Sequence, residues 1–187
     1  MFSGVGGFEL GLENVGCLQQ EDKARMPESD RPLPQLYSCV GFSEIDKYAC
    51  ELLKHRFPNI HNFGDATKIN PSELPDFDML CGGVPCQSWS IAGKRKGFED
   101  IRGTMWFEVF RITKAKKPSY LLLENVKGLL SHDGGKSFER LAEMICEMGY
   151  VIDFTVLNSK YFGVPQNRER VFILAIREDL LNKSQII

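Results

Sequence analysis

Three short motifs place reactive side chains at the ends of runs that predict β-strands. In chain order they are Pro85-Cys86-Gln87, Glu124-Asn125 and the set Gln166, Arg168 and Arg170. A cysteine thiolate adds covalently to an electrophilic carbon, and a carboxyl group can donate a proton. Arginine donates in a fork to carbonyl or phosphate oxygens. These residue types together favour nucleophilic catalysis on a substrate that carries such oxygens.

Each of these residues also has a plainer interpretation. Most free cysteines are small buried hydrophobes, and Cys81, inside a predicted strand, fits that description better than Cys86. No histidine accompanies Cys86 in a motif, so a Cys–His hydrolase fits poorly. Glu124 could be a helix-capping or ion-paired glutamate, and the arginines could form surface salt bridges.

A second group of residues predicts a nucleotide-like pocket. Gly4, Gly6 and Gly7 let the backbone approach a ligand closely where a helix begins, although they do not match G-x-G-x-x-G and a plain tight turn explains them equally well. Glu44 stands where an acidic residue of an α/β fold binds ribose hydroxyls, but a helix-start carboxylate is the alternative. Asp65 similarly reads as a turn aspartate when taken alone. Because all three features follow successive strand-like segments, we expect them to converge on one pocket.

The elements that must position these residues alternate along the chain. Apolar runs predict strands, and periodic apolar positions predict helices. The predicted strands are 37–42, 76–81, 119–124, 150–157 and 170–176, and the predicted helices are 46–57, 103–115 and 136–148. Asp46 is the expected N-cap of the first helix. The apolar positions expected to share one helix face are Tyr48, Ala49, Leu52, Leu53 and Phe57 in the first helix and Trp106, Val109, Phe110 and Thr113 in the second. This order of strands and helices predicts an α/β fold with a doubly wound, mostly parallel sheet whose last two strands form an antiparallel edge hairpin. Ligands of such sheets bind at the carboxyl ends of the strands, where the motifs lie.

Two features interrupt this pattern. Only Met1, Phe2 and Ser3 precede the N-terminal glycines, so we expect the first strand of the sheet to be truncated in this chain. Residues 18–36 are polar and rich in proline, which predicts an excursion or a disordered loop.

Composition limits the class of protein. The 187 residues are 43% hydrophobic and 26% charged, as expected of one soluble domain spanning 1–187, with no membrane span and no export leader. We therefore expect a cytoplasmic protein of bacterial type with reduced cysteines and no metal site, since the three histidines are not at ligand spacing. The net charge of −2 lacks the basic footprint of a self-sufficient DNA-binding protein, and the main local cluster is Lys94, Arg95, Lys96 and Arg102.

Taken in order, the motifs resemble those of the DNA (cytosine-5)-methyltransferases. The stretches that carry the resemblance are "FSGVGGFELGLE", "SEID", "GD", "GGVPCQSWSIAGKRKGFEDIRG", "LLLENVKGLLSHDGG" and "YFGVPQNRERVFILAIR". They run from residue 2 to about 179, apart from the 17–36 excursion. The resemblance implies a Rossmann-like S-adenosylmethionine-dependent methyltransferase fold. It also implies methyl transfer from S-adenosylmethionine to carbon 5 of a flipped-out cytosine in double-stranded DNA, in a restriction-modification or similar DNA-methylation system, with S-adenosylhomocysteine as product.

The resemblance also implies roles for single residues. Cys86 is the covalent nucleophile, Glu124 contacts ring nitrogen 3 and the exocyclic amine, Arg170 contacts the ring carbonyl, and Arg168 lies nearby on the base or a phosphate. The implied cofactor-binding residues are Phe2, Ser3, Gly4, Gly6, Gly7, Glu44, Ile45, Asp65, Ala66, Gly83 and Pro85. The implied substrate-binding residues are Gln87, Ser90, Lys94, Arg102 and Gln166, and the segment 85–103 closes over the flipped base.

The chain departs from the family's pattern at its C-terminus. Family members continue into a target-recognition domain and a final motif, whereas this sequence ends at Ile187. We weigh a split enzyme that needs a second polypeptide, a truncated or expressed fragment, and a non-catalytic remnant. The imperfect glycine pattern and the Pro-Cys-Gln and Glu-Asn-Val motifs disfavour a nicotinamide-dependent dehydrogenase, and RNA remains a minor alternative acceptor.

Overall fold

The computed structural model describes residues 37–84 and 105–181. These residues fall into two compact parts, 37–65 and 66–181. The predictions for the truncated first strand and for the excursion at 18–36 lie outside the described residues, and a single domain spanning 1–187 stays a prediction.

The first part is built on one helix, α3 (Lys47–Arg56). As predicted, Asp46 caps it, because its side chain accepts a hydrogen bond from the backbone N–H of Ala49 at 2.8 Å. Leu53 is buried with Phe42 and Phe57 in a small apolar cluster. Tyr48, expected on the same face, is 77% exposed.

The predicted strand at 37–42 is wrong. Phe42 makes a single parallel bridge with Asn62, through hydrogen bonds from Phe42 N to His61 O (2.9 Å) and from Phe63 N to Phe42 O (2.8 Å). Among the described residues the ladder extends no further in either direction, so the apolar run stays an extended segment. Glu44 therefore follows a bridge and not a strand.

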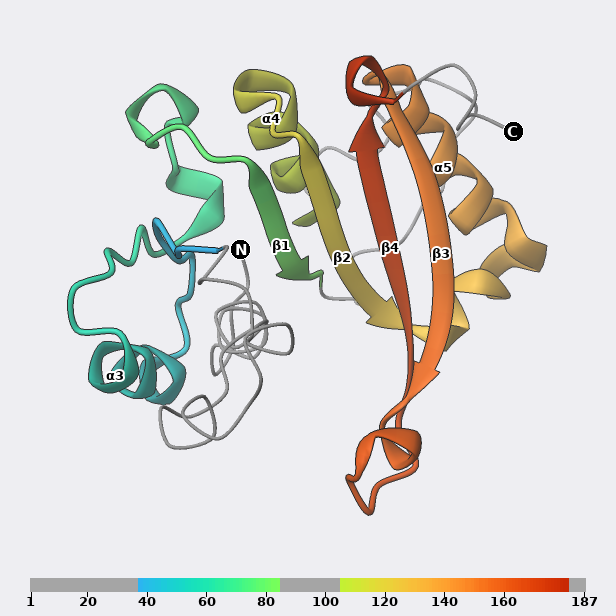
Figure 1. The fold of residues 1–187 in the computed structure, drawn as a ribbon, viewed down its shortest axis with the longest axis horizontal. Helices are drawn as coiled ribbons and strands as arrows, with labels where there is room; N and C mark the ends of the chain where they lie inside the picture. The colour runs from blue at the N-terminus through green and yellow to red at the C-terminus, as the bar shows by residue number, and fades with distance from the viewer. Residues whose placement is uncertain (1–36, 85–104, 182–187) are drawn as a thin grey trace, which may run out of the picture. The chain divides into compact units, whose positions relative to one another are not determined.

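The second part contains a four-stranded sheet in the order β1-β2-β4-β3 (Figure 1). The strands are β1 (Met79–Gly83), β2 (Tyr120–Val126), β3 (Tyr150–Asn158) and β4 (Glu169–Arg177). β1 and β2 are parallel, while β4 is antiparallel to both β2 and β3. The predicted antiparallel hairpin is confirmed, and β3 lies at one edge of the described sheet.

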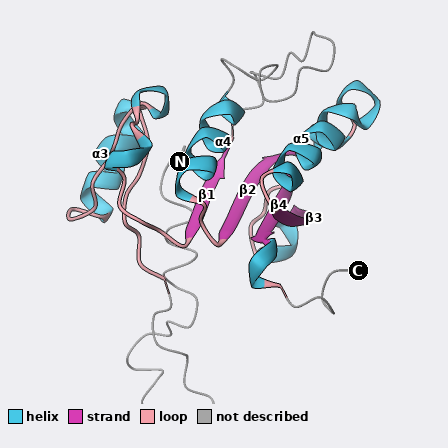
Figure 2. Ribbon diagram, turned by 90° about the horizontal axis from the view of Figure 1, so that it is seen from above, coloured by secondary structure: helices cyan, strands magenta, loops and turns pink. Residues whose placement is uncertain are grey.

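Two helices, α4 (Met105–Lys116) and α5 (Lys136–Glu147), lie on the same face of this sheet (Figures 1 and 2). The predicted apolar face of α4 is confirmed, since Trp106, Val109, Phe110 and Thr113 are all buried. After α5, Gly149 takes a φ of +85°, which only glycine adopts readily at a helix end. The short 3₁₀ turns are η2 (Ala66–Lys68), η3 (Pro71–Glu73), η6 (Lys127–Leu130), η7 (His132–Gly135), η8 (Ser159–Phe162) and η9 (Glu178–Leu180).

One edge of the sheet collects the ends that matter for the site. β1, β2 and β3 all end at this edge and β4 begins there (Figure 1). Residues that are far apart in the chain, such as Glu124 at the end of β2 and Arg170 at the start of β4, are therefore brought together by strand pairing.

Tyr150, the first residue of β3, gives a testable pH dependence. Its side chain is 3% exposed and its hydroxyl donates to the Pro118 carbonyl at 2.6 Å, and burial raises the pKa of the phenol. The unfolded chain, with a tyrosine pKa of about 10, therefore loses this proton first, so stability falls as the pH rises above about 10. We expect Tyr150→Phe to cost about 1 kcal/mol at neutral pH and to remove this alkaline loss.

Urea unfolding at about pH 8 and about pH 10.5 measures both effects, because these values lie on either side of the ordinary tyrosine pKa. Tyr120→Phe, at the half-exposed start of β2, is the control. Equal alkaline losses in the wild type and in Tyr150→Phe would contradict this assignment.

Candidate active site

The central feature of the site is an ion pair between Glu124 and Arg170. The Arg170 Nε lies 2.7 Å from Glu124 Oε1, and the two side chains are 21% and 22% exposed. In the register of β2 and β4, Glu124 faces Phe172 while Arg170 faces Val126, so the guanidinium reaches diagonally across β2. Arg170 NH1 also donates to the Glu169 carbonyl at 2.8 Å. A carboxylate and a fork of donors are thus held side by side, partly screened from water.

A pocket of about 330 Å³ surrounds this pair. Its polar wall is formed by Glu124, Ser159, Arg168 and Arg170, and its apolar wall by Leu157, Phe162 and Phe172. The volume is at the lower end of the range of about 300–1,000 Å³ typical of small-molecule sites. An apolar wall with a few convergent polar groups suits a planar ring that has hydrogen-bonding edges.

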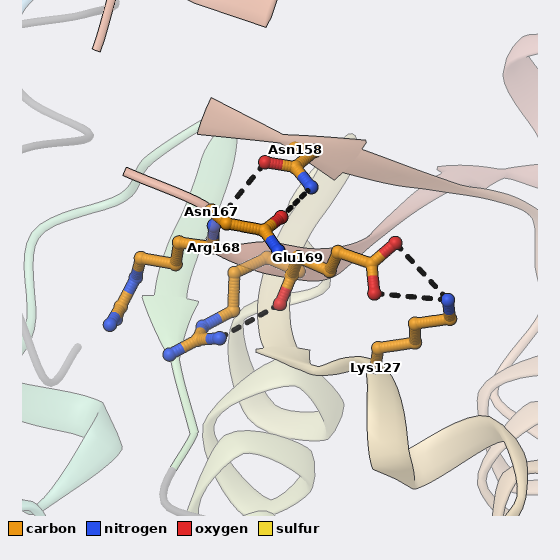
Figure 3. Close-up of polar contacts among 6 residues, drawn as sticks. Lys127, Asn158, Asn167, Arg168 and Glu169 are labelled. Atoms are coloured by element: carbon orange, nitrogen blue, oxygen red, sulfur yellow. Dashed lines mark hydrogen bonds and ion pairs between the residues drawn. The ribbon is translucent and has the colours of Figure 1, made fainter. Parts of the chain in front are cut away.

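The predicted residues after β3 divide between this pocket and the surface. Arg168 lines the pocket although its side chain is exposed, and its backbone N–H is held by Asn158 (Figure 3). Gln166 is exposed and is not among the residues that line the pocket. Glu169, between the two arginines, pairs instead with Lys127, whose Nζ lies 3.0 Å from a carboxylate oxygen (Figure 3).

Asn125 fixes the chain that leaves β1, a role that sequence reasoning did not assign. This side chain is 2% exposed, and its Nδ2 donates to the Val84 carbonyl at 2.9 Å. Val84 N in turn donates to the Glu124 carbonyl at 3.2 Å. The exit of β1, which continues into Pro85 and Cys86, is therefore bonded directly to the strand that carries Glu124. The only available signal was that an asparagine follows Glu124 at a buried strand end.

Gly83 leaves room for the Glu124 carboxylate. The two residues are register partners, and a Cβ built on Gly83 would lie 3.0 Å from Glu124 Oε2. The other carboxylate oxygen, Oε1, bonds Arg170, so a shift of the carboxylate away from that Cβ would alter this contact. Gly83, predicted as a cofactor-binding residue, is thus also a neighbour of the catalytic candidate.

We expect Gly83→Ala to lower the rate of the methyl transfer that the resemblance implies by about tenfold, because a shift of a few tenths of an ångström in a reacting group costs less than the ~100-fold of a 1 Å misplacement. The measurement is the initial rate at saturating cofactor. Gly128→Ala is the matched control, since a Cβ there would meet only Val126 Cγ2 at an ordinary 3.9 Å. An unchanged rate in Gly83→Ala would show that Glu124 needs no such space.

In the first part of the structure, Glu44 and Ile45 present groups that suit a nucleoside. Glu44 is partly buried, and its Oε1 accepts the backbone N–H groups of Ile45 and Asp46, both at 2.9 Å. Asn62 binds the backbone of Glu44 at both its N–H and its carbonyl (3.1 Å each). Beside this oriented carboxylate, Ile45 is 72% exposed. A fixed carboxylate can accept from ribose hydroxyls and an exposed aliphatic side chain can pack on a purine, so these residues fit the adenosine end of S-adenosylmethionine.

Asp65 and Ala66 were predicted to bind the same cofactor. Asp65 is partly buried, whereas the Ala66 side chain is 3% exposed and belongs to the core. The Ala66 carbonyl accepts from Arg111 NH2 at 3.0 Å, and Arg111 is itself paired with the buried Glu108 at 2.7 Å. Any contact of Ala66 with cofactor would therefore use its backbone. Both roles stay predictions.

The remaining predicted site residues lie outside the described residues: Phe2, Ser3, Gly4, Gly6, Gly7, Pro85, Cys86, Gln87, Ser90, Lys94 and Arg102. In the described ranges 37–84 and 105–181, no three His, Cys, Asp or Glu side chains gather as a metal would require. No helix in these same ranges has the length and apolar character needed to cross a membrane.

Comparison with solved structures supports the predicted fold. A mutant of Spodoptera frugiperda DNMT2 matches 97% of this chain and 50% of its own with a TM-score of 0.68 and 21% identity. Schizosaccharomyces pombe Dnmt2 matches 95% of this chain and 49% of its own with a TM-score of 0.65 and 20% identity. The chain therefore has the α/β fold of these methyltransferases, as predicted.

Sequence relatives share more residues. The orphan methyltransferase M.SPRI of Bacillus phage SPR is 47% identical over 189 residues, which cover 99% of this chain and 38% of the relative. The type II methyltransferase M.HhaI of Haemophilus parahaemolyticus is 40% identical over 180 residues, covering 96% of this chain and 49% of the relative. The chain thus spans half or less of the length of these relatives. Residues 1–187 match the model of the C-5 cytosine-specific DNA methylases, and the chain belongs to that family.

Proposed function

We propose that this chain carries the catalytic part of a DNA cytosine-5 methyltransferase that moves a methyl group from S-adenosylmethionine to carbon 5 of a flipped-out cytosine. The observation that supports it best is the Glu124–Arg170 pair inside a pocket with an apolar wall, at the sheet edge where β1 leads into Pro85 and Cys86. Family membership and the relatives named above point to the same activity.

The pocket suits the hydrogen-bonding edge of cytosine. That edge presents an amine, ring nitrogen 3 and a carbonyl oxygen in a row. Glu124 can accept from the amine and hold a proton at nitrogen 3, while the Arg170 fork can donate to the carbonyl. The ring itself would lie against the apolar side chains of Leu157, Phe162 and Phe172. Since Glu124 and Arg170 bond each other in this structure, the incoming base replaces that contact with its own edge.

Cys86 supplies the nucleophile in this proposal. It follows Val84 by two residues, and two residues of chain reach at most about 7 Å. Its thiolate adds to carbon 6 of cytosine, and the electrons of the 5,6 double bond then form a bond from carbon 5 to the methyl carbon. The sulfur–methyl bond breaks at the same time, and its electrons stay on the sulfur of the departing S-adenosylhomocysteine. A proton held at nitrogen 3 by Glu124 stabilises the charge that this addition places on the ring. Loss of the carbon 5 proton to a base re-forms the double bond and expels the Cys86 thiolate.

The cofactor's contribution is a methyl group on a positively charged sulfur, which is ready to leave. Glu44 and Ile45 fit its ribose and adenine. The further cofactor-binding residues that the resemblance implies are Phe2, Ser3, Gly4, Gly6, Gly7, Asp65, Ala66, Gly83 and Pro85. The chain's part is to bind this group and to exclude water from it. A cytosine inside a stacked duplex cannot reach these residues, so the base must be flipped out, as in other enzymes that act on bases.

Activity of the chain by itself is a separate question. The chain spans half or less of its relatives, so a second polypeptide carrying target recognition is part of the proposal. The alternative is a non-catalytic remnant that at most binds cofactor. The test supplies labelled S-adenosylmethionine and unmethylated bacterial DNA to the full chain, alone and with lysate of its source, and identifies the methylated base by mass spectrometry.

The account predicts 5-methylcytosine that depends on Cys86, with little or none from the chain alone. A different methylated base would contradict the proposal, and absence of product under both conditions would support the remnant.

A further inference from the structure

Asn158, the last residue of β3, is a buried polar side chain that the proposed chemistry does not use. It is 6% exposed, although the residues that follow it are mostly on the surface. In the register of β3 and β4 it faces Glu169, between Arg168 and Arg170. A buried amide at such a point must find partners for its donors and acceptor, and these partners show what it holds.

The Asn158 side chain bonds both ends of the β3–β4 loop, and Figure 3 shows its contacts at the end that enters β4. Its Oδ1 accepts from Lys160 N, at the start of the loop, and from Arg168 N, at the end, each at 3.2 Å. Its Nδ2 donates to Asn167 Oδ1 at 2.6 Å. One amide therefore ties the segment that leaves β3 to the segment that enters β4.

Ser159 shares in this closure, because its N–H donates to the Arg168 carbonyl at 3.1 Å and its hydroxyl donates to the Gln166 carbonyl. The closure sets the backbone that leads into the two arginines. Residues 161–169 are all exposed, so packing does little to fix the chain there. The Arg170 guanidinium is placed by two contacts, Nε on Glu124 and NH1 on the Glu169 carbonyl. A backbone shift at Arg168 and Glu169 would move the second contact directly and, through it, the first.

We propose that Asn158 is a positioning residue that holds the start of β4 so that Arg168 and Arg170 face Glu124 across the pocket. The effect of this positioning on catalysis rests on the proposed function. The competing explanation is that Asn158 only caps η8, as Asn70 caps η3 by accepting from Ser72 N. The two explanations differ because a cap needs one acceptor contact, whereas the closure needs contacts on both sides of the loop.

Arginine labelling of the full chain tests the closure without requiring any activity. Phenylglyoxal modifies accessible guanidinium groups, and peptide mass spectrometry gives a rate for each arginine. Arg170 is the reporter. Arg177, at the other end of β4, is the internal control because it is similarly exposed (31% against 21%) and is also ion-paired, to Asp179.

In Asn158→Ala we expect Arg170 to be labelled about fivefold faster, the factor that corresponds to one lost hydrogen bond of ordinary net strength, with Arg177 unchanged. Asn158→Asp should restore the wild-type rate, because its carboxylate still accepts both N–H groups and the Asn167 amide can turn to donate. Asn70→Ala, the matched cap variant, should leave Arg170 unchanged.

Asn158→Ser distinguishes closure of the loop from capping of η8. It also replaces the alanine variant in this test if that variant does not fold. Serine still caps η8 well, but its shorter side chain does not hold both ends of the loop, so the Arg170 rate should rise as in the alanine variant. Wild-type labelling of Arg170 in Asn158→Ser, with Arg177 unchanged, would overturn the proposal. Where methyl transfer is measurable, the serine variant should lower kcat and raise the KM for DNA while the Kd for S-adenosylmethionine stays the same. Failure of the proposed function would appear as no transfer by the wild type even with lysate of its source, and the labelling result would still decide the role of Asn158.

Discussion

Cys86→Ser is expected to abolish methyl transfer, by a factor on the order of 10⁴ or more, the scale seen when a covalent nucleophile is removed. A serine hydroxyl keeps its proton at neutral pH and is a far weaker nucleophile than a thiolate, so carbon 6 of cytosine is not attacked. The Kd for S-adenosylmethionine should not change, because the loss concerns the reacting base. Rates from labelled cofactor, taken under the conditions in which the wild-type chain is active, and binding by calorimetry measure the two quantities separately.

Cys81→Ser is the matched control for this variant. Cys81 belongs to β1, pairs in register with Leu122 and is partly buried, so its replacement alters the same strand without touching the proposed nucleophile. We expect Cys81→Ser to keep most of the activity. A rate of methyl transfer in Cys86→Ser close to that of the wild type would contradict the covalent mechanism.

Glu124→Gln should lower kcat by about 10²–10³, the usual effect of removing one group that stabilises developing charge. The amide can still accept from the cytosine amine, so base recognition is partly kept. It cannot hold the proton at nitrogen 3, and it leaves the Arg170 guanidinium without the carboxylate it bonds at 2.7 Å. The loss should therefore appear mainly in kcat, measured at saturating DNA.

Glu169→Gln controls for removing a carboxylate at this edge of the sheet. Glu169 pairs with Lys127, and both side chains are about half exposed, so the pair contributes little. We expect nearly wild-type kinetics. If both variants lose activity equally, the effect belongs to the general charge of this edge and not to Glu124.

Much of the fold followed from periodicity. The buried face of α4 was predictable because its apolar residues recur at helical spacing. The antiparallel hairpin of β3 and β4 was predictable because two apolar runs are joined by a short polar connection, and β4 buries alternate residues, Val171, Ile173 and Ala175. The prediction of a strand at 37–42 was wrong because an apolar run does not form a strand without a neighbouring strand to pair with. Within this run, among the described residues, only Phe42 makes a β-bridge. The prediction that Tyr48 lies on the buried face of α3 was wrong because helical spacing does not show how wide that face is.

The site was predictable only in its residue types. Glu124 and Arg170 could be assigned to one edge of a sheet, but their contact depends on the two-residue offset between β2 and β4, which no local pattern encodes. The contacts of Asn125 with Val84 and of Asn158 with Lys160 and Arg168 join segments that are remote in sequence or sit across a loop. Such side-chain-to-backbone bonds leave no periodic signal.

The most direct measurement traps the chain on a DNA duplex that contains 5-fluorocytosine, in the presence of S-adenosylmethionine and lysate of its source, followed by peptide mass spectrometry. Fluorine at carbon 5 cannot leave as a proton does, so the covalent adduct persists after methyl transfer. The account predicts an adduct on the peptide that contains Cys86, absent in Cys86→Ser and present in Cys81→Ser. An adduct on another residue, or methyl transfer to cytosine with no adduct on Cys86, would contradict it.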